Sequence, residues 1–387
     1  MKKWVVFCVC VFCLIVCVFV FDVSYLFHGI RCTYFRGESS AQIDDHRFFY
    51  TREVFSKSPV LIPNGHDYVG EVTNSDLRRV LEKSNSVAFL VVKNDSVRVE
   101  RYWQGYGPES LTNSFSMAKS IMSILVGCAI DDGHIEGVNE SVFDFVPELE
   151  PFKKNDVKIK HLLEMSSGYD WLENYKRPIS VTAKAYYGTA LRDLILKQRF
   201  VGFPGKEHVY SSGSTQLLGL VLERAVGESV SSYAGRVFWS KIGAKQNALW
   251  ALDDQGGVEK TFCCFNSNAR DFSKIGLLML GGGGDVVSKD YVDWVLSVPR
   301  LVDPNKKKGG EHFVDFYSNG WWVANVLEKD VFYARGFLGQ YIVVIPDLNL
   351  VFVRLGMYEN EKSSLKNDYM LTDNLKFFIE QVIFDFS

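Results

Sequence analysis

The strongest hydrophobic signal in the chain is a run of 18 apolar residues, Trp4 to Phe21, that contains no charge, Gly or Pro. A helix rising about 1.5 Å per residue would carry this run across about 27 Å, close to the hydrocarbon thickness of a bilayer. Lys2 and Lys3 precede the run, and the positive-inside rule places such residues in the cytoplasm. We therefore expect residues 1–24 to form an N-terminal transmembrane helix that anchors the chain, with the rest of the chain in the periplasm or at the cell surface.

A secretory signal that is removed is the alternative interpretation of the same run. Signal peptides have a shorter apolar core, of about 7–15 residues, and a cleavage site with small residues. Residues 22–27, Asp-Val-Ser-Tyr-Leu-Phe, offer no such site. A lipoprotein signal at Cys17 fits poorly because the preceding Val16 is not small. Both main interpretations export the body of the protein.

Beyond the run, the pattern becomes that of a globular chain. Residues 25–80 mix polar and apolar positions with Pro and Gly, which predicts a linker and entry segment. Val87–Val92 is rich in β-formers, and Val97–Trp103 alternates after the turn Asn94-Asp95, so we expect a β-hairpin. Asn113–Ile130 has apolar residues at helical spacing after a capping-type residue, which predicts a buried helix.

The clearest pattern of elements lies near the end of the chain. Four short apolar runs are separated by tight polar connections: Asn319–Val326, Val331–Phe337, Gln340–Ile345 and Leu350–Leu355. They predict an antiparallel meander, and Leu365–Phe386 predicts a closing helix. Strands at both ends of a helical region predict one α/β (α+β) domain over residues 81–387. We expect an antiparallel sheet flanked by helices, with an inserted all-helical region over about 136–235.

Composition narrows the class of protein. With 47% hydrophobic and 23% charged residues, the 387-residue chain is not disordered as a whole. The 43 basic and 46 acidic residues give a net charge of −3, which excludes a general nucleic-acid binder. Four of the eight cysteines lie in the apolar run, so the cysteines do not form a disulfide framework. We expect Cys263-Cys264 to be packing residues, because adjacent cysteines rarely join without strain.

Two glycine-containing segments have simple interpretations. Residues 306–310, Lys-Lys-Lys-Gly-Gly, predict a solvated loop rather than a binding patch, and Gly281–Gly284 predicts a turn. The motifs of metal and nucleotide enzymes are missing, since the chain has no His-Glu-x-x-His helix, no phosphate-binding Gly loop and no Gly-x-Ser-x-Gly elbow. The seven histidines are scattered. We therefore expect no metal and no cofactor.

The candidate chemistry begins at Ser116-Met117-Ala118-Lys119. Residues three apart share one face of a helix, so the hydroxyl of Ser116 and the amine of Lys119 would lie side by side. A first-turn position would add free backbone N–H groups and the positive end of the helix dipole. The apolar residues that follow would bury Lys119 and lower its pKa from about 10.4 toward 7, as a base requires.

The spacing by itself is weak, because about one or two Ser-x-x-Lys matches are expected by chance in a chain of this length. A second match, Ser363 to Lys366, lies in a polar segment with no apolar continuation. The apolar helix around Ser116 is what separates the two matches.

Three further blocks follow Ser116 in order along the chain. They are residues 161–168 (His-Leu-Leu-Glu-Met-Ser-Ser-Gly), residues 210–213 (Tyr-Ser-Ser-Gly) before an apolar helix pattern, and residues 334–340 (Ala-Arg-Gly-Phe-Leu-Gly-Gln) between two predicted strands. This ordered set resembles the serine β-lactamase and penicillin-binding superfamily over roughly residues 80–385. It is most similar to the class C β-lactamase-related branch, which includes esterases, D-aminopeptidases and 6-aminohexanoate-dimer hydrolases. The resemblance implies a β-lactamase/transpeptidase-like fold.

The resemblance also implies a role for the matching residues. Ser116 would be the acylated nucleophile and Lys119 its base or proton relay. Tyr210 would exchange protons with the nucleophile, the leaving group and the incoming water. The backbone N–H groups of Ser116 and Phe337 would form the oxyanion hole.

Two matching triplets depart from the family pattern. The usual Tyr-x-Asn reads Tyr-Ser-Ser, and Ser212 therefore lacks an amide that commonly contacts the acyl side chain. The usual Lys-Thr-Gly or His-x-Gly begins with Ala334, which lacks the side chain that holds a β-lactam carboxylate. We expect Ser212, Arg335 and Gly336 to bind substrate, with Gly336 letting the strand backbone approach it closely. The departures argue against an efficient β-lactamase and are closer to the 6-aminohexanoate-dimer hydrolase group.

Residues near the second block have less specific interpretations. The block around His161 is largely structural in the family, so we exclude it from the site. Five residues that follow it are candidates to line the cleft: Asp170, Trp171, Tyr175, Tyr186 and Tyr187. Aromatic residues such as the last four are more often core or rim residues than substrate contacts.

The function implied by the resemblance is hydrolysis of a small amide or ester through an acyl-enzyme on Ser116. Candidate substrates are 6-aminohexanoate oligomers, D-amino-acid peptides and carboxylesters, and the membrane is the expected partner of the N-terminal helix. Three alternatives remain open at this point. The chain is a penicillin-recognising sensor or binding module with little turnover, a weak β-lactamase, or a purely structural membrane protein.

Overall fold

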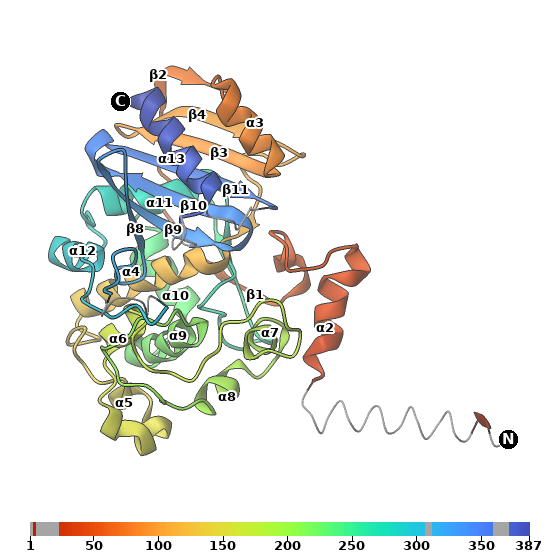
Figure 1. The fold of residues 1–387 in the computed structure, drawn as a ribbon, viewed down its shortest axis with the longest axis vertical. Helices are drawn as coiled ribbons and strands as arrows, with labels where there is room; N and C mark the ends of the chain where they lie inside the picture. The colour runs from red at the N-terminus through yellow and green to blue at the C-terminus, as the bar shows by residue number, and fades with distance from the viewer. Residues whose placement is uncertain (1–2, 5–22, 306–311, 359–370) are drawn as a thin grey trace.

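A seven-stranded sheet forms the upper half of the molecule in Figure 1. The computed structural model describes residues 3–4, 23–305, 312–358 and 371–387. The strand order is β2-β4-β3-β11-β10-β9-β8, and every neighbouring pair is antiparallel except β2 with β4. The strands are β2 Asn64–Val69, β3 Ser86–Lys93, β4 Ser96–Tyr102, β8 Trp322–Val326, β9 Lys329–Gly336, β10 Gln340–Ile345 and β11 Leu350–Gly356.

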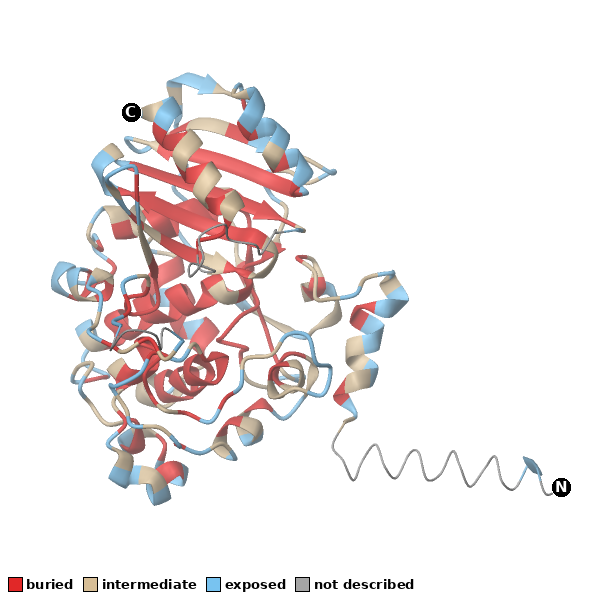
Figure 2. Cartoon of the chain, viewed as in Figure 1, coloured by how far each residue is buried: buried red, intermediate tan, exposed pale blue. Residues whose placement is uncertain are grey.

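The predicted hairpin and meander are both confirmed by this sheet. Strands β3 and β4 pair directly, and β8 to β11 pair in chain order. Side chains alternate between the two faces, so Leu90 and Val92 of β3 enter one core while Phe89 and Val91 enter the other. Each face is covered by helices: α3 Ser75–Lys83 and α13 Asp373–Phe386 on one side, and α11 Ala269–Leu280 on the other. The central strands β3, β11 and β10 are therefore buried on both faces, whereas the edge strand β2 is largely exposed (Figure 2).

A buried helix connects the sheet to the helical half of the molecule. It is α4, Ala118–Asp131, and the short 3₁₀ turn η3, Phe115–Met117, leads into it. Helix α4 packs against β9 of the sheet and against α9, Ser212–Val226. Nearly all of its residues are buried, which explains the continuous apolar sequence after Lys119. This central position brings the first turn of α4 to the boundary between the two halves.

The helical half contains most of the remaining helices (Figure 1). These are α5 Val142–Phe145, α6 Ile159–Leu163, α7 Val181–Tyr187, α8 Leu191–Leu196, α10 Val230–Ala234, with the 3₁₀ segment η4 Pro147–Asn155 and the π-helical turn η5 Gly235–Trp239. Helix α12, Lys289–Leu296, packs on α4. The boundaries of the predicted insertion, 136–235, stay a prediction.

The expectation of a linker over residues 25–80 is corrected by the structure. This segment contains α2 Tyr25–Cys32, the 3₁₀ turns η1 Tyr34–Arg36 and η2 Asp45–Phe48, strand β1 Thr51–Val54, β2 and α3. Strand β1 pairs with β6, Ala248–Ala251, in a second sheet of order β1-β6-β7-β5 that also contains β7 Phe265–Ser267 and β5 Thr112–Asn113. The pairing partners lie far away in the sequence, so the local pattern did not reveal these strands.

Two predicted helices have different beginnings in the structure. Asn113 belongs to β5, where it pairs with Asn266, and the helix begins only after it. Helix α13 begins at Asp373 because the Thr372 hydroxyl accepts a hydrogen bond from the Leu375 N–H and caps the helix. The predicted start at Leu365 lies outside the described residues.

The predicted membrane anchor stays a prediction. In the parts of the chain that are described, no helix is long and apolar enough to cross a membrane. The predicted anchor falls mainly on residues 5–22, which lie outside the described residues, as do Ser363–Lys366 and the loop at 306–310. The turn predicted at Gly281–Gly284 is confirmed.

The interpretation of the adjacent cysteines as simple packing residues is wrong. Cys263 and Cys264 are joined by a disulfide, and both are buried. Cys264 has a φ of 70°, in the left-handed region, in the segment that leads into β7. This local backbone turn, which the sequence did not indicate, brings the two neighbouring side chains together.

Candidate active site

The hydroxyl of Ser116 lies in the turn that leads into α4. The N–H of Phe115 donates to Asn113 Oδ1 at 2.8 Å, and Phe115 has a φ of 45°. A bulky residue with positive φ is uncommon and marks a backbone held by its surroundings. The chain therefore leaves strand β5 abruptly and presents Ser116, which is only partly buried, at the start of the helix.

Lys119 lies one turn after Ser116, and only 3% of it is exposed. Its Nζ donates hydrogen bonds to Ser116 Oγ at 3.0 Å and to the carbonyl oxygen of Phe262 at 2.9 Å. The same atom lies 5.0 Å from the centre of the Tyr210 ring. Burial lowers the pKa of Lys119 from 10.5 to about 8, while the Glu173 carboxylate acts in the opposite direction. The amine is thus far easier to deprotonate than an exposed lysine and can accept a proton from Ser116.

Tyr210 approaches Ser116 from the loop before α9. The two side chains are hydrogen bonded, and burial raises the pKa of the Tyr210 phenol. Its ring stacks on Trp322 of β8, with centroids 5.5 Å apart, and meets the edge of Tyr317 at 6.2 Å. These aromatic contacts fix the ring, and the raised pKa keeps the phenol protonated, so it can donate a proton near Ser116.

Gly336 ends strand β9 directly against the turn that carries Ser116. A Cβ at Gly336 would lie 2.1 Å from the carbonyl oxygen of Ser114, so no larger residue fits without movement of the backbone. The expected close approach at Gly336 is therefore to the protein's own backbone. The next residue, Phe337, packs its ring edge-on against Phe115, with centroids 5.5 Å apart. The backbone N–H groups of Ser116 and Phe337 thus come from two segments held in contact.

The remaining predicted binding residues come from two different elements, Ser212 from α9 and Arg335 from β9. Ser212 begins α9, where its N–H and its hydroxyl each donate to the Glu173 carboxylate at 2.8 Å. Arg335 is partly buried and lies near enough to Tyr210 to oppose the rise in its pKa. Ala334 is buried in the sheet opposite Ile342 and offers no side chain to the site.

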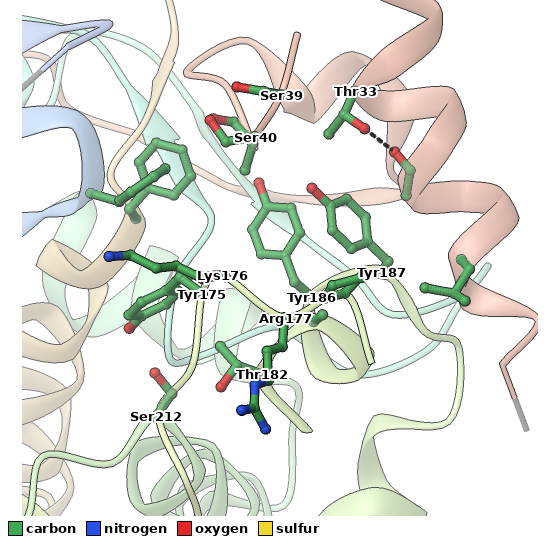
Figure 3. A pocket seen from close by; sticks show the side chains of 18 of the residues that line it. Thr33, Ser39, Ser40, Tyr175, Lys176, Arg177, Thr182, Tyr186, Tyr187 and Ser212 are labelled. Carbon is green, nitrogen blue, oxygen red and sulfur yellow. Dashed lines mark hydrogen bonds between the residues drawn. The ribbon is translucent and has the colours of Figure 1, made fainter. Parts of the chain in front are cut away.

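Two cavities meet at Ser116. The α2 cavity, of about 220 Å³, lies between α2, α7 and the start of α9 and includes Phe115, Ser212 and Phe337 in its walls (Figure 3). The β9 cavity, of about 470 Å³, includes Glu173, Tyr210 and Arg335. Tyr175 lines both cavities, and its ring stacks on Phe337.

The five weaker candidates for the cleft do not all line these cavities. Tyr175, Tyr186 and Tyr187 line the α2 cavity, whereas Asp170 and Trp171 line neither. Trp171 instead donates its indole N–H to Glu173 at 3.1 Å. His161 is buried away from both cavities, and its Nδ1 accepts from the Lys158 N–H at 3.1 Å. Among the described residues, no three His, Cys, Asp or Glu side chains converge as metal ligands.

Sequence reasoning missed Glu173, which connects several parts of the site. Its carboxylate accepts from Ser212 and Trp171 and influences the pKa of Lys119. It occurs in a polar loop where an acidic residue is unremarkable, so no local signal identified it.

Arg354 of β11 was also missed. It is fully buried, and its guanidinium donates to the carbonyl oxygens of Leu338 and Gly339 at 2.8 and 2.7 Å. These two residues form the turn that follows Phe337, so Arg354 holds the outer wall of the site in place. The sequence did contain a signal for Arg354, because it is the one charged residue within the otherwise apolar strand β11.

Comparisons with known proteins agree with this arrangement. The Beta-lactamase family model matches residues 76–372. A 6-aminohexanoate-dimer hydrolase from Paenarthrobacter ureafaciens is 28% identical over 309 residues, which cover 73% of this chain and 75% of that protein. A structure titled "Putative 6-aminohexanoate-dimer hydrolase from Bacillus anthracis" has a TM-score of 0.70 at 18% identity and covers 89% of this chain and 92% of that one. A penicillin binding protein from Bacillus halodurans has a TM-score of 0.58 at 15% identity, with 80% and 99% covered. The family match spans more than half of the chain and the solved structures share its fold, so this chain belongs to the beta-lactamase family.

Proposed function

We propose that the protein is a serine hydrolase that cleaves a small amide or ester through an acyl-enzyme on Ser116. The observation that carries the proposal is the hydrogen bond from buried Lys119 to Ser116, beside the protonated Tyr210 phenol. Membership of the beta-lactamase family and similarity to a hydrolase of 6-aminohexanoate dimers support hydrolysis as the reaction.

The proposed reaction begins with neutral Lys119. At pH 7 a lysine with a pKa of about 8 is neutral in about a tenth of the molecules, a much larger share than for an exposed lysine. Its amine takes the proton from Ser116, and Oγ attacks the substrate carbonyl carbon. The oxyanion that forms would be held by the N–H groups of Ser116 and Phe337.

Collapse of this intermediate completes the first half of the reaction. Tyr210 donates its proton to the leaving group as the bond to the carbonyl breaks, and Lys119 returns a proton to Tyr210. Water then attacks the acyl-enzyme, with the same groups removing its proton, and the acid is released from Ser116. The balance is one water consumed for each amide or ester cleaved.

A labelling experiment tests this proposal. A fluorophosphonate probe should modify Ser116 in the wild-type protein, as mapped by mass spectrometry, and Ser116→Ala should abolish the labelling because the nucleophile is gone. Ser363→Ala is the matched control, since Ser363 belongs to the second Ser-x-x-Lys match, and it should label normally. Labelling that survives Ser116→Ala would contradict the mechanism.

A penicillin-recognising sensor is the second candidate function. The observation that bears on it is the buried Ala334, which leaves the strand without the side chain that would hold a β-lactam carboxylate and so argues against efficient turnover of a β-lactam. Incubation with labelled penicillin distinguishes the two: a sensor accumulates a stable adduct on Ser116, and a hydrolase releases product.

We also propose that Trp4–Phe21 anchors the protein in a membrane, with the catalytic body in the periplasm or at the cell surface. The support is the length of the apolar run and the lysines that precede it.

A further inference from the structure

The walls of the α2 cavity present mainly carbon to its interior. Among the polar groups in the walls, the Thr33 hydroxyl donates to the Gly29 carbonyl at 2.7 Å, and the Tyr186 hydroxyl donates to Asp45 at 2.9 Å. Ser212 is held by Glu173 in the same way. Two cations, Lys176 and Arg177, also line the cavity, and both are exposed. No Asp or Glu is among the described residues that line this cavity. A ligand with an uncharged apolar body therefore fits the apolar part of these walls, and an ammonium group would be buried near two cations without a counter-ion.

The position of Tyr210 decides which half of the substrate each cavity would receive. Tyr210 lines the β9 cavity and does not line the α2 cavity, whereas Ser212 does the reverse. A proton donor must lie next to the leaving group when the scissile bond breaks. The leaving group therefore belongs in the β9 cavity, and the acyl group extends from Ser116 into the α2 cavity.

The mouth of the α2 cavity is bordered by exposed apolar side chains. Ile30, Tyr34 and Tyr175 line the cavity and are 38%, 68% and 59% exposed. Phe27 and Phe35, on the same stretch of chain as Ile30 and Tyr34, are 63% and 82% exposed. Exposed apolar groups gathered at one place indicate contact with an apolar ligand or surface.

Helix α2 also stands directly after the apolar run, and it is fixed to the body near the mouth. The Tyr25 hydroxyl donates to the Pro178 carbonyl at 3.1 Å, and the His28 ring is hydrogen bonded to the Tyr187 carbonyl at 3.1 Å. Figure 3 shows Thr33 of this segment facing Tyr186 and Tyr187 of α7 across the cavity. The wall of the cavity therefore includes a helix that follows the apolar run in the sequence, since α2 begins four residues after Phe21.

We infer that the α2 cavity binds an unbranched, methyl-ended acyl chain, so that the substrate is an ester or amide of a fatty acid. This inference rests on the proposed function, because the chain is the acyl group transferred to Ser116. By this inference, an acyl chain that ends in an ammonium group is a poor substrate, because its buried charge would meet no carboxylate among the described residues that line the cavity.

A series of p-nitrophenyl esters measures the preference for chain length. With the full-length protein in phosphatidylcholine nanodiscs, kcat/KM should rise by about threefold to fourfold for each added methylene from acetate through butyrate to hexanoate, the factor expected when a methylene group is buried. Values for Ser116→Ala are subtracted as the background. A flat or falling series overturns the inference.

Filling the cavity should remove this preference. Ala183 of α7 lines the cavity, and Ala183→Trp should lower the ratio of hexanoate to acetate kcat/KM at least tenfold. Ala190→Trp is the matched control, because Ala190 is exposed and lines neither cavity. Gly29→Leu, on the opposite wall, is the second variant in case Ala183→Trp does not fold, since a Cβ there meets the Tyr187 ring at an ordinary 3.4 Å. An unchanged ratio in the folded variants overturns the inference.

Two esters of equal length test the chemistry of the chain end. The heptanoate ester should react with a kcat/KM about tenfold or more above that of the 6-aminohexanoate ester, because only the second buries an ammonium group. Fluorophosphonate labelling of Ser116 is measured in parallel. If Ser116 is labelled normally but the two esters react equally or in reversed order, the fatty-acyl inference is overturned while the proposed serine hydrolase is still supported. Loss of labelling overturns both proposals.

Discussion

The amine of Lys119 is the residue on which the proposed chemistry depends most directly. A lysine that is 3% exposed loses the hydration that stabilises its charge, which brings its pKa down to about 8. The Glu173 carboxylate limits this effect by favouring the charged form. The pair therefore sets the pH at which Ser116 can be deprotonated.

The first prediction is that activity depends on the ionisation of this lysine. In the wild type, kcat/KM should rise with pH and level off above about 8, because only neutral Lys119 accepts the Ser116 proton. Glu173→Gln removes the charge that raises the pKa of Lys119, so the rising limb should move to lower pH. A pH–rate profile with an acyl ester measures both.

The control for this experiment is Glu148→Gln. Glu148 pairs with Arg224 on the surface and lines neither cavity, so its substitution should leave the profile in place. A limb that stays fixed or moves to higher pH in Glu173→Gln would contradict the assigned electrostatic role.

At the scale of elements, the site depends on the contact between the end of β9 and the turn before α4. Gly336 touches the Ser114 carbonyl, Phe337 packs on Phe115, and Arg354 holds the turn that follows. The two N–H groups of the proposed oxyanion hole lie on these two segments. Their spacing is therefore set by backbone packing between a strand and a helix that are far apart in the sequence.

Gly336→Ala should separate these two segments. Its Cβ would lie 2.1 Å from the Ser114 oxygen, so the strand must move away from Ser116. We expect the rate of fluorophosphonate labelling to fall by about 10²–10³-fold, as for loss of an oxyanion-hole donor. The free energy of unfolding should fall by about 1–3 kcal/mol, as for overpacking. Labelling kinetics and urea unfolding measure the two effects.

Gly107→Ala is the matched control. A Cβ at Gly107 meets no atom within 4 Å, and its φ lies outside the left-handed region. The control should therefore change the free energy of unfolding by less than about 0.5 kcal/mol and leave labelling unchanged. Labelling of Gly336→Ala at the wild-type rate would show that the spacing of the two segments is unimportant.

At the scale of the whole molecule, the site lies where the sheet half and the helical half meet. Ser116 comes from the turn that leads into the central helix, Lys119 from that helix, Phe337 from the turn after β9, and Tyr210 from the loop that enters α9. Helix α2 adds a further wall and continues from the apolar run. Residues 25–48 thus form one packed segment that lies in the sequence between the proposed membrane segment and the residues of the proposed catalytic site.

The prediction at this scale concerns the attachment to the membrane. If Trp4–Phe21 spans the bilayer, the full-length protein should remain in the membrane fraction after alkaline carbonate extraction, because about 27 Å of apolar helix cannot leave the hydrocarbon. Protease added to spheroplasts should degrade the body, whereas a cytoplasmic control protein stays intact. Release by carbonate, or protection of the body in intact spheroplasts, would contradict the proposed topology.

Much of the architecture could be predicted from local patterns. The alternation in β3 and β4, the four strands near the end of the chain and the apolar residues after Lys119 each reflect a face that must be buried. The Ser-x-x-Lys spacing is equally local, because one helical turn brings residues 116 and 119 together. Periodicity and short-range geometry depend only on neighbouring residues, so the sequence by itself determined these features.

Other features were decided only by the tertiary structure. Glu173 beside Ser212, the Phe262 carbonyl on Lys119 and the wall that α2 adds to the cavity each join segments far apart in the chain. The strands within residues 25–80 were missed because their partners are also distant. Contacts between distant segments produce no periodic pattern in the sequence. A polar loop residue or a short apolar run looks the same locally whether or not it makes such a contact. The sequence therefore brings Ser116 and Lys119 together, and folding determines the electrostatic environment of that lysine and the shape of the space beside it.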